Sequence, residues 1–350
     1  MFKNFSTSKS TSNLRTYGPG IIILLKQKQE TNAFCIKKKK MFHVKRFVWN
    51  NRKSSDIIEP AIDVYKINLK TVARKLKLYR KIQMKTNWKE LVMGRAIAIA
   101  NQKGGVGKST TAINLSSCLG AMGQKVLTID LDPQGNTTSG LGVEKDAAEN
   151  TVYELLLGEC EVEECLQKLE FEGVSLIPSN VNLAGAEIEL IGIEDKEYIL
   201  QKKISKIRDQ FDFIIIDCPP SLNMLTINAM TTANTVLVPI QCEYYALEGL
   251  SQLMHTIELV QERLNPDLEM EGVVFTMYDA RTNLSLQVVE NVKNNLNQTI
   301  YKTIIPRNVR LAEAPSHGLP INYYDARSTG AESYQLLAEE VIHRGDEEWQ

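Results

Sequence analysis

The chain has 350 residues, a hydrophobic content of 43% and a formal net charge of −1, so it is long enough for one large or two smaller domains with a buried core. Its six cysteines form no C-x-x-C pair and no metal-ligand spacing, which argues against a metal centre and is typical of a reducing cytoplasm. The longest apolar run near the N-terminus, Ile21 to Leu25, is too short to span a bilayer.

The charge divides the chain near residue 92. Residues 1–92 carry 22 Lys and Arg against 5 Asp and Glu, whereas residues 93–350 carry 19 against 37. The first segment has Lys-rich and Ser/Thr/Asn-rich patches without a sustained hydrophobic period, and only Ile67 to Met84 has the pattern of a basic helix. We therefore expect residues 1–92 to be a disordered basic extension or the product of a misassigned translation start, and residues 93–350 to be the folded domain.

From Met93 onward, short apolar strands alternate with helical patterns. This alternation predicts an α/β fold with a mainly parallel twisted sheet and helices on both faces. We expect strands at 96–100, 126–130, 174–178, 211–217, 235–240, 272–277 and 300–305, and helices at 246–264, 284–296 and 331–343. Residues 194–210 have the composition of a charged surface helix.

A glycine-rich loop lies between the first expected strand and the helical pattern that follows it. Glycines without a Cβ let successive N–H groups converge on an anion, and the next helix directs the positive end of its dipole to the same place. Lys108 is placed to reach the β- and γ-phosphates of a nucleotide, and the Ser109 hydroxyl is placed to bind Mg²⁺. The predicted nucleotide-binding residues are Lys103, Gly104, Gly105, Val106, Gly107, Lys108, Ser109 and Thr110.

This loop departs from the common pattern G-x-x-x-x-G-K-[ST] at its first position. Gln102 stands where the pattern has glycine, and a second lysine, Lys103, follows it.

Two further carboxylates follow predicted strands. Asp132 lies just beyond the strand at 126–130, and Asp217 ends the strong apolar run at 211–217. The carboxyl ends of parallel strands form the edge at which such folds bind ligands. We predict that Asp132 orients or activates the attacking water, and that Asp217 holds Mg²⁺ directly or through water. For Asp132 the alternative is an ordinary turn, because Asp-Pro and Gln-Gly-Asn are good turn sequences.

The loop K-G-G-V-G-K-S, its flanks Asn101-Gln102 and Thr110-Thr111, and the later string D-L-D-P-Q-G-N resemble the ParA/MinD superfamily, and in particular its chromosomal ParA branch, called Soj. The resemblance covers about Gly94 to the C-terminus. It implies a Rossmann-like P-loop NTPase with a deviant Walker A motif that hydrolyses ATP with Mg²⁺. It also implies that Lys103 reaches across a dimer interface to the partner's nucleotide, where its charge acts as an arginine finger does.

The same resemblance assigns two later loops. Pro306 and Asn308 match the segment that frames the adenine, and Arg281 and Arg310 occupy positions that contact DNA phosphates in Soj-like proteins. For each arginine taken alone, a solvated surface charge is the alternative.

The function implied by the resemblance is chromosome or plasmid partition in the cytoplasm, on the nucleoid. An ATP sandwich homodimer binds double-stranded DNA without sequence preference and is released when a ParB/Spo0J-type partner stimulates hydrolysis. A nucleotide-switched regulator of sporulation or replication stays open as an alternative. A MinD-like membrane cycle would need a basic amphipathic helix at the C-terminus, and the sequence after Glu339 is acidic. No membrane partner is therefore expected, and an iron–sulfur carrier would need bridging cysteines in a pattern that this chain lacks.

One string in the basic segment bears on the start codon. Phe42-His43-Val44-Lys45 has the codon solution TTT-CAC-GTG-AAA, which is its own reverse complement and resembles the core of parS, the site that ParB binds. We hypothesise that residues 1–92 are an upstream stretch carrying a parS site, with the functional protein beginning at or near Met93. A coincidental string within a genuine basic arm is the alternative.

Overall fold

The computed structural model describes residues 13–17, 21–28, 31–38, 46–48, 94–243, 246–296 and 299–344. The chain divides into two units, Met1–Thr86 and Asn87–Gln350. In the first, β1 (Asn13–Tyr17), β2 (Ile21–Lys28), β3 (Thr31–Lys38) and β4 (Arg46–Val48) pair in that order as an antiparallel sheet. These strands have no sustained alternation of apolar and polar residues, so the sequence pattern does not predict them. The basic helix expected at 67–84 and the string at 42–45 lie outside the described residues.

The second unit is built on an eight-stranded sheet with the order β12-β11-β10-β5-β9-β6-β8-β7. Its neighbouring strands run parallel except for the short β7, which is antiparallel to β8. The mainly parallel sheet is therefore confirmed. Its strands are β5 (Arg95–Ile99), β6 (Val126–Asp130), β7 (Gln167–Lys168), β8 (Val174–Ile177), β9 (Phe213–Asp217), β10 (Thr235–Gln241), β11 (Glu269–Tyr278) and β12 (Ile300–Pro306).

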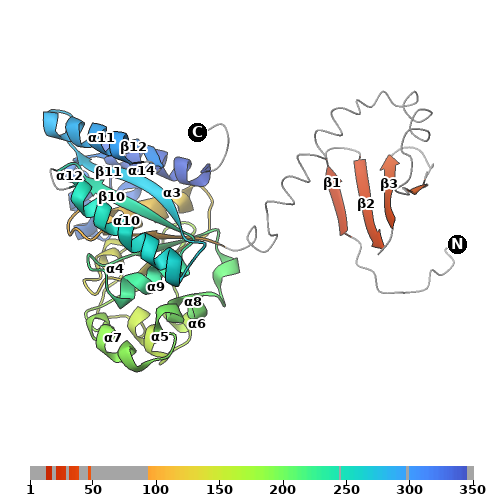
Figure 1. Ribbon diagram of the computed structural model, residues 1–350, viewed down its shortest axis with the longest axis horizontal. Coiled ribbons are helices and arrows are strands. Elements are labelled where there is room, and N and C mark those ends of the chain that lie inside the picture. Colours follow the sequence, from red (N-terminus) through yellow and green to blue (C-terminus); the bar gives the residue numbers. More distant parts are fainter. Residues whose placement is uncertain are drawn as a thin grey trace. The chain divides into compact units, whose positions relative to one another are not determined.

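Helices cover both faces of this sheet, as the alternation of elements predicts (Figure 1). Successive residues of the central strand β5 point to opposite faces: Ala96 and Ala98 join one core, and Ile97 and Ile99 join the other. The helices are α3 (Lys108–Ala121), α4 (Asn136–Gly140), α5 (Val152–Leu157), α6 (Val162–Cys165), α7 (Leu183–Glu189), α8 (Ile199–Ile204), α9 (Met224–Thr232), α10 (Ala246–Arg263), α11 (Asn283–Asn295), α12 (Val309–Glu313), α13 (Ile321–Tyr324) and α14 (Thr329–Ile342), with 3₁₀ turns at η1 (Leu190–Gly192), η2 (Lys196–Tyr198), η3 (Arg208–Gln210) and η4 (Ala314–His317).

The two cores differ in their helices. The core containing Ile97 and Ile99 is closed by α3 and α14, which pack against each other. The core containing Ala96 and Ala98 is filled by apolar residues of α5 to α11. Each face therefore buries a continuous apolar layer, and the parallel pairing of β10, β5, β9 and β6 brings their carboxyl ends to the same edge of the sheet.

The prediction of a single charged surface helix at 194–210 is wrong. The structure has the turn η2, the six-residue helix α8 and the turn η3 in its place. Leu200, Ile204 and Ile207 are buried at helical spacing in the core containing Ala96, and charged residues between them mask this apolar stripe in the sequence. Arg208 is also buried, and its guanidinium donates to the backbone oxygens of Gly94 and Thr232 at 3.0 and 3.1 Å.

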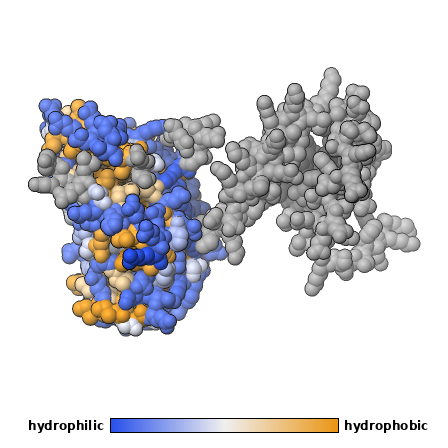
Figure 2. Space-filling model, viewed as in Figure 1, coloured by the Kyte–Doolittle hydropathy of each residue, from blue (hydrophilic) through white to orange (hydrophobic). Residues whose placement is uncertain are grey.

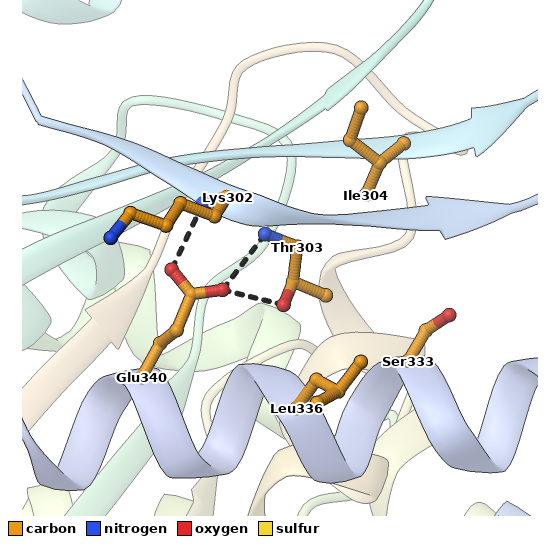
Figure 3. A pocket seen from close by; sticks show the side chains of 6 residues that line it. All are labelled: Lys302, Thr303, Ile304, Ser333, Leu336 and Glu340. Carbon is orange, nitrogen blue, oxygen red and sulfur yellow. Dashed lines mark hydrogen bonds between the residues drawn. The ribbon is translucent and has the colours of Figure 1, made fainter. Parts of the chain in front are cut away.

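The edge strand β12 is covered by α14. The Glu340 carboxylate accepts hydrogen bonds from the backbone N–H groups of Lys302 and Thr303, at 2.9 and 2.8 Å, and from the Thr303 hydroxyl (Figure 3). Leu336, Ser333 and Ile304 line the shallow pocket beside this contact. An edge strand whose N–H groups are occupied by a carboxylate is a poor template for pairing with another strand.

Among the described residues, no helix combines the length and apolar character that crossing a membrane requires.

Candidate functional site

The glycine-rich loop connects the buried strand β5 to α3, which begins at Lys108 directly after the loop. Gly105 and Gly107 have φ angles of 74° and 91°, in the left-handed region that strains other residues. A Cβ at Gly104 would meet no atom within 4 Å, so that position is open toward solvent. The loop therefore curls at the N-terminus of a 14-residue helix, which is the arrangement that binds phosphate.

Neighbouring strands hold the loop in place. The Thr276 hydroxyl of β11 donates to the Val106 carbonyl at 2.8 Å, and Asn101 donates from Nδ2 to the Pro239 carbonyl of β10 at 2.7 Å. The Asn101 side chain also accepts from the Lys103 N–H at 3.0 Å. The sequence analysis did not assign Thr276, and Asn101 entered it only as a flank of the motif. A polar residue inside the apolar run of β11 was the available signal for Thr276.

Lys108 is the first residue of α3, directly after the glycine-rich loop. Its side chain is buried, and Nζ donates to the Lys103 carbonyl at 3.2 Å. Burial lowers the pKa of Lys108, while the carboxylates of Asp217 and Asp132 oppose that shift by their charge. The structure thus brings the predicted lysine together with both predicted carboxylates.

Asp217 ends β9 in register with Asp130, which ends β6, and both carboxyls are fully buried. Thr137 donates from Oγ1 to Asp217 Oδ2 at 2.7 Å, but Oδ1 has no hydrogen-bond partner among the residues that the structure describes. Burial and the neighbouring Asp130 raise the pKa of Asp217, whereas the hydroxyls of Thr137 and Ser109 lower it. A buried, unpartnered carboxylate oxygen beside a serine hydroxyl fits a Mg²⁺ ion, which takes hard oxygen ligands and favours the ionised carboxylate.

Asp130, the last residue of β6, and Asp132, two positions later, have different surroundings. Asp130 accepts from the N–H and the hydroxyl of Thr138, both at 2.7 Å, and so supports the short helix α4. Asp132 is nearly buried, and its Oδ1 accepts from the Gln134 N–H at 2.9 Å. The turn expected as an alternative for Asp132 is therefore present, and the carboxylate also lies within the electrostatic reach of Lys108.

Lys103 extends from the loop to Glu243, which follows β10, and the two form an ion pair. Both side chains are partly exposed, at 36% and 44%. Glu243 was not singled out in the sequence, because only the sheet order places the end of β10 beside the loop after β5.

Pro306 and Asn308 lie at the carboxyl end of β12, the same edge of the sheet as the loop. The Asn308 side chain caps α12 by accepting from the Leu311 N–H at 3.3 Å, and its Nδ2 donates to the Thr329 hydroxyl at 2.8 Å. These bonds fix the orientation of the amide. The role of both residues toward adenine stays a prediction.

Both predicted DNA-contacting arginines are paired with carboxylates. Arg281 donates from Nε and Nη2 to the two carboxylate oxygens of Asp279, at 2.8 and 2.7 Å. Arg310 pairs with Glu313 at 2.9 Å and with Asp325 at 3.5 Å. Their contact with DNA stays a prediction, and the paired carboxylates compete with phosphate for both guanidinium groups.

Thr110 lies in the first turn of α3, and Cys218 is buried beside Asp217. Burial raises the pKa of the Cys218 thiol, so it behaves as a small core residue and not as a reactive thiolate.

Comparisons with known proteins show the family and the fold. An AAA domain family model, AAA_31, matches residues 94–270. The chain is 55% identical over 253 residues to the sporulation initiation inhibitor protein Soj of Bacillus subtilis, covering 72% of this chain and all of that protein. It is 50% identical to the chromosome partitioning protein ParA of Myxococcus xanthus, covering 72% and 89%. Among solved structures, a Mycobacterium smegmatis protein titled cobyrinic acid a,c-diamide synthase, with bound ADP and magnesium, is 38% identical with a TM-score of 0.64, covering 72% and 95%.

Proposed function

Because this chain belongs to the ParA/Soj family of chromosome-partitioning ATPases, we propose that it binds and releases DNA through a cycle of ATP-driven dimerisation and hydrolysis. It is an ATPase that uses ATP and Mg²⁺, with a P-loop fold. The observation that supports the proposed residue roles is the cluster at the loop, where the side chains of Lys108, Asp132 and Asp217 are buried and the Ser109 hydroxyl lies beside Asp217.

In this proposal the loop glycines and the N-terminus of α3 hold the phosphates, with Lys108 as the buried counter-charge. Ser109 and Asp217 hold Mg²⁺, which when bound neutralises charge on the β- and γ-phosphates. Asp132 orients the attacking water from the neighbouring strand end. Pro306 and Asn308 frame the base at the end of β12.

Lys103 completes the site of a second copy. Its side chain is partly exposed and pairs with Glu243, whereas the Lys108 side chain is buried and its Nζ donates to the Lys103 carbonyl. A lysine with this exposure supports a role across a dimer interface, where positive charge stabilises the transferring phosphoryl group.

DNA binding is assigned to Arg281 and Arg310, and release to a ParB-type partner that stimulates hydrolysis. Residues 93–350 are acidic overall, so DNA contact requires local basic groups, which a dimer would present in two copies. The alternative, a nucleotide-switched regulator of sporulation or replication, is not favoured: one relative is named as a sporulation initiation inhibitor, but others that are 50% and 48% identical carry chromosome-partitioning names.

Two lysine variants test the core of this proposal. Lys108→Ala should abolish ATP binding, because it removes the buried charge that faces the phosphates. Lys103→Ala should keep ATP binding but lose both the ATP-dependent dimer and hydrolysis. Calorimetric titration with ATP, sedimentation and phosphate release measure the three properties. A Lys103→Ala protein that hydrolyses ATP at the parent rate would disprove the role across the interface.

A further inference from the structure

Glu243 lies opposite Lys103, two residues after β10 ends. It lies in the turn between β10 and α10, where its N–H donates to the Gln241 carbonyl at 2.8 Å and its carbonyl accepts from the Ala246 N–H at 3.0 Å. The backbone on the other side is equally constrained, because Asn101 links the start of the loop to the Pro239 carbonyl of β10. Both members of the ion pair are therefore attached to the same stretch of sheet.

This arrangement commits Lys103 to a carboxylate of its own chain. A lysine that interacts with the nucleotide of a second copy cannot hold Glu243 in the same way at the same time. We propose that Glu243 is a positioning residue that holds Lys103 within the free chain, and that forming the ATP dimer requires both copies to give up this ion pair. The inference rests on the proposed role of Lys103 across the interface.

The exposure of the pair suits such a release. Side chains that are 36% and 44% exposed form an ion pair that water screens, so each pair is weak, while the triphosphate offers several negative charges at once. Two pairs break per dimer, so the effect of one pair enters the dimer constant twice. If one pair changes an equilibrium by about 1.4- to 5.5-fold, two pairs shift the dimer constant by about 2- to 30-fold.

The test uses the full chain with a non-hydrolysable ATP analogue and Mg²⁺, so that hydrolysis does not affect the dimer. Glu243→Gln removes the charge and keeps the shape, and Glu243→Asp keeps the charge. Glu258→Gln is the matched control, because it removes a carboxylate from the solvent face of α10, where its only described partner is His255. Sedimentation measures the dimer constant, and amine-modification rates read by mass spectrometry report the accessibility of Lys103 without nucleotide.

We expect Glu243→Gln to strengthen the dimer by about 2- to 30-fold and to raise the modification rate of Lys103, with Glu258→Gln and Glu243→Asp close to the parent. Unchanged modification of Lys103 in Glu243→Gln would overturn the proposal. So would faster modification with an unchanged or weaker dimer, because Glu243 would then not restrain dimerisation. If Lys103→Ala still forms the dimer, the proposed function fails at that step, whatever the modification rates show for Glu243.

Discussion

At the scale of single residues, Asp132 is both a turn former and the predicted water-positioning group. Asp132→Ala should trap the ATP dimer and lower hydrolysis by about 10²- to 10⁴-fold, because the phosphate cradle is intact while the group that orients water is gone. Asp132→Asn is the control for the turn, since its amide oxygen still accepts from the Gln134 N–H. Single-turnover hydrolysis and sedimentation with ATP measure both effects. Normal turnover in both variants would show that Asp132 forms the turn but does not orient the attacking water.

Arg281 is held by Asp279, and this ion pair should restrain DNA binding. Arg281 lowers the pKa of Asp279 to about 2. The pKa of Asp279 is lower in the folded chain than in the unfolded chain. The contribution of the pair to the free energy of unfolding is therefore present above about pH 4 and is lost as the pH falls toward 2. The carboxylate is therefore ionised wherever DNA binding is assayed, and it competes with phosphate for the guanidinium.

Asp279→Asn should raise affinity for duplexes of any sequence by about 2- to 10-fold, and Arg281→Glu should lower it and reduce the slope of affinity against salt. Fluorescence anisotropy across a salt series, with the ATP dimer preformed, measures both. Glu313→Gln beside Arg310 provides the parallel test on α12. If all of these variants bind DNA with the affinity of the parent, the two arginines are solvated surface charges that do not contact DNA.

Residues of the local motif were predictable, and residues that act through the sheet were not. Lys108, Ser109 and Asp217 were singled out from motif spacing and from the ends of strands, whereas the roles of Lys103 and Asp132 came from the family resemblance, and all five roles stay predictions. Thr276 and Glu243 could not be assigned, because their partners are 170 and 140 positions away in sequence. Only the order β11-β10-β5 brings them to the loop.

At the scale of elements, the loop depends on its strand neighbours. Thr276→Val removes the hydroxyl that donates to the Val106 carbonyl and leaves that buried oxygen without a donor. We expect the free energy of unfolding to fall by about 1–3 kcal/mol and ADP affinity to weaken, because the loop loses its attachment to β11. Thr276→Ser keeps the hydroxyl and should retain ADP affinity. Urea unfolding and calorimetric titration with ADP measure the two effects, and full ADP affinity in Thr276→Val would show that the loop holds its shape alone.

Element boundaries were predictable where burial is complete. The strand predicted at 126–130 is confirmed at both ends, and β9 and β10 start or end within two residues of their predicted limits, because strands buried on both faces read as continuous apolar runs. The prediction for 194–210 failed because charged residues separate Leu200, Ile204 and Ile207 in the sequence. The composition indicates a surface helix, but these three side chains are buried in the folded chain.

At the scale of the whole molecule, the part of the chain from Gly94 onward forms its sheet from its own residues. The central strand β5 pairs with β10 on one side and β9 on the other. Its start is fixed by Arg208, whose Nε donates to the Gly94 carbonyl at 3.0 Å, and by the Arg95 N–H, which donates to the Asp212 carbonyl at 2.9 Å. A Cβ on Gly94 would lie 2.5 Å from the Phe211 carbonyl oxygen, so the entry to β5 is already closely packed.

We therefore predict that a chain beginning at Met93 folds and works without residues 1–92. Its thermal midpoint should lie within about 2 °C of the full chain, since a stability change below 1 kcal/mol shifts a domain of this size by only a few degrees. Its ADP affinity and its dimer constant with ATP should equal those of the full chain, because Lys103, Lys108 and Asp217 keep their partners. Calorimetry, titration and sedimentation of the two proteins side by side make the comparison, with the Gly94→Ala variant of the short chain as a control that should lose stability. A short chain that aggregates or fails to bind ADP would show that residues 1–92 contribute to the folded domain. Sequencing the mature N-terminus then tells which of the two forms is the native protein.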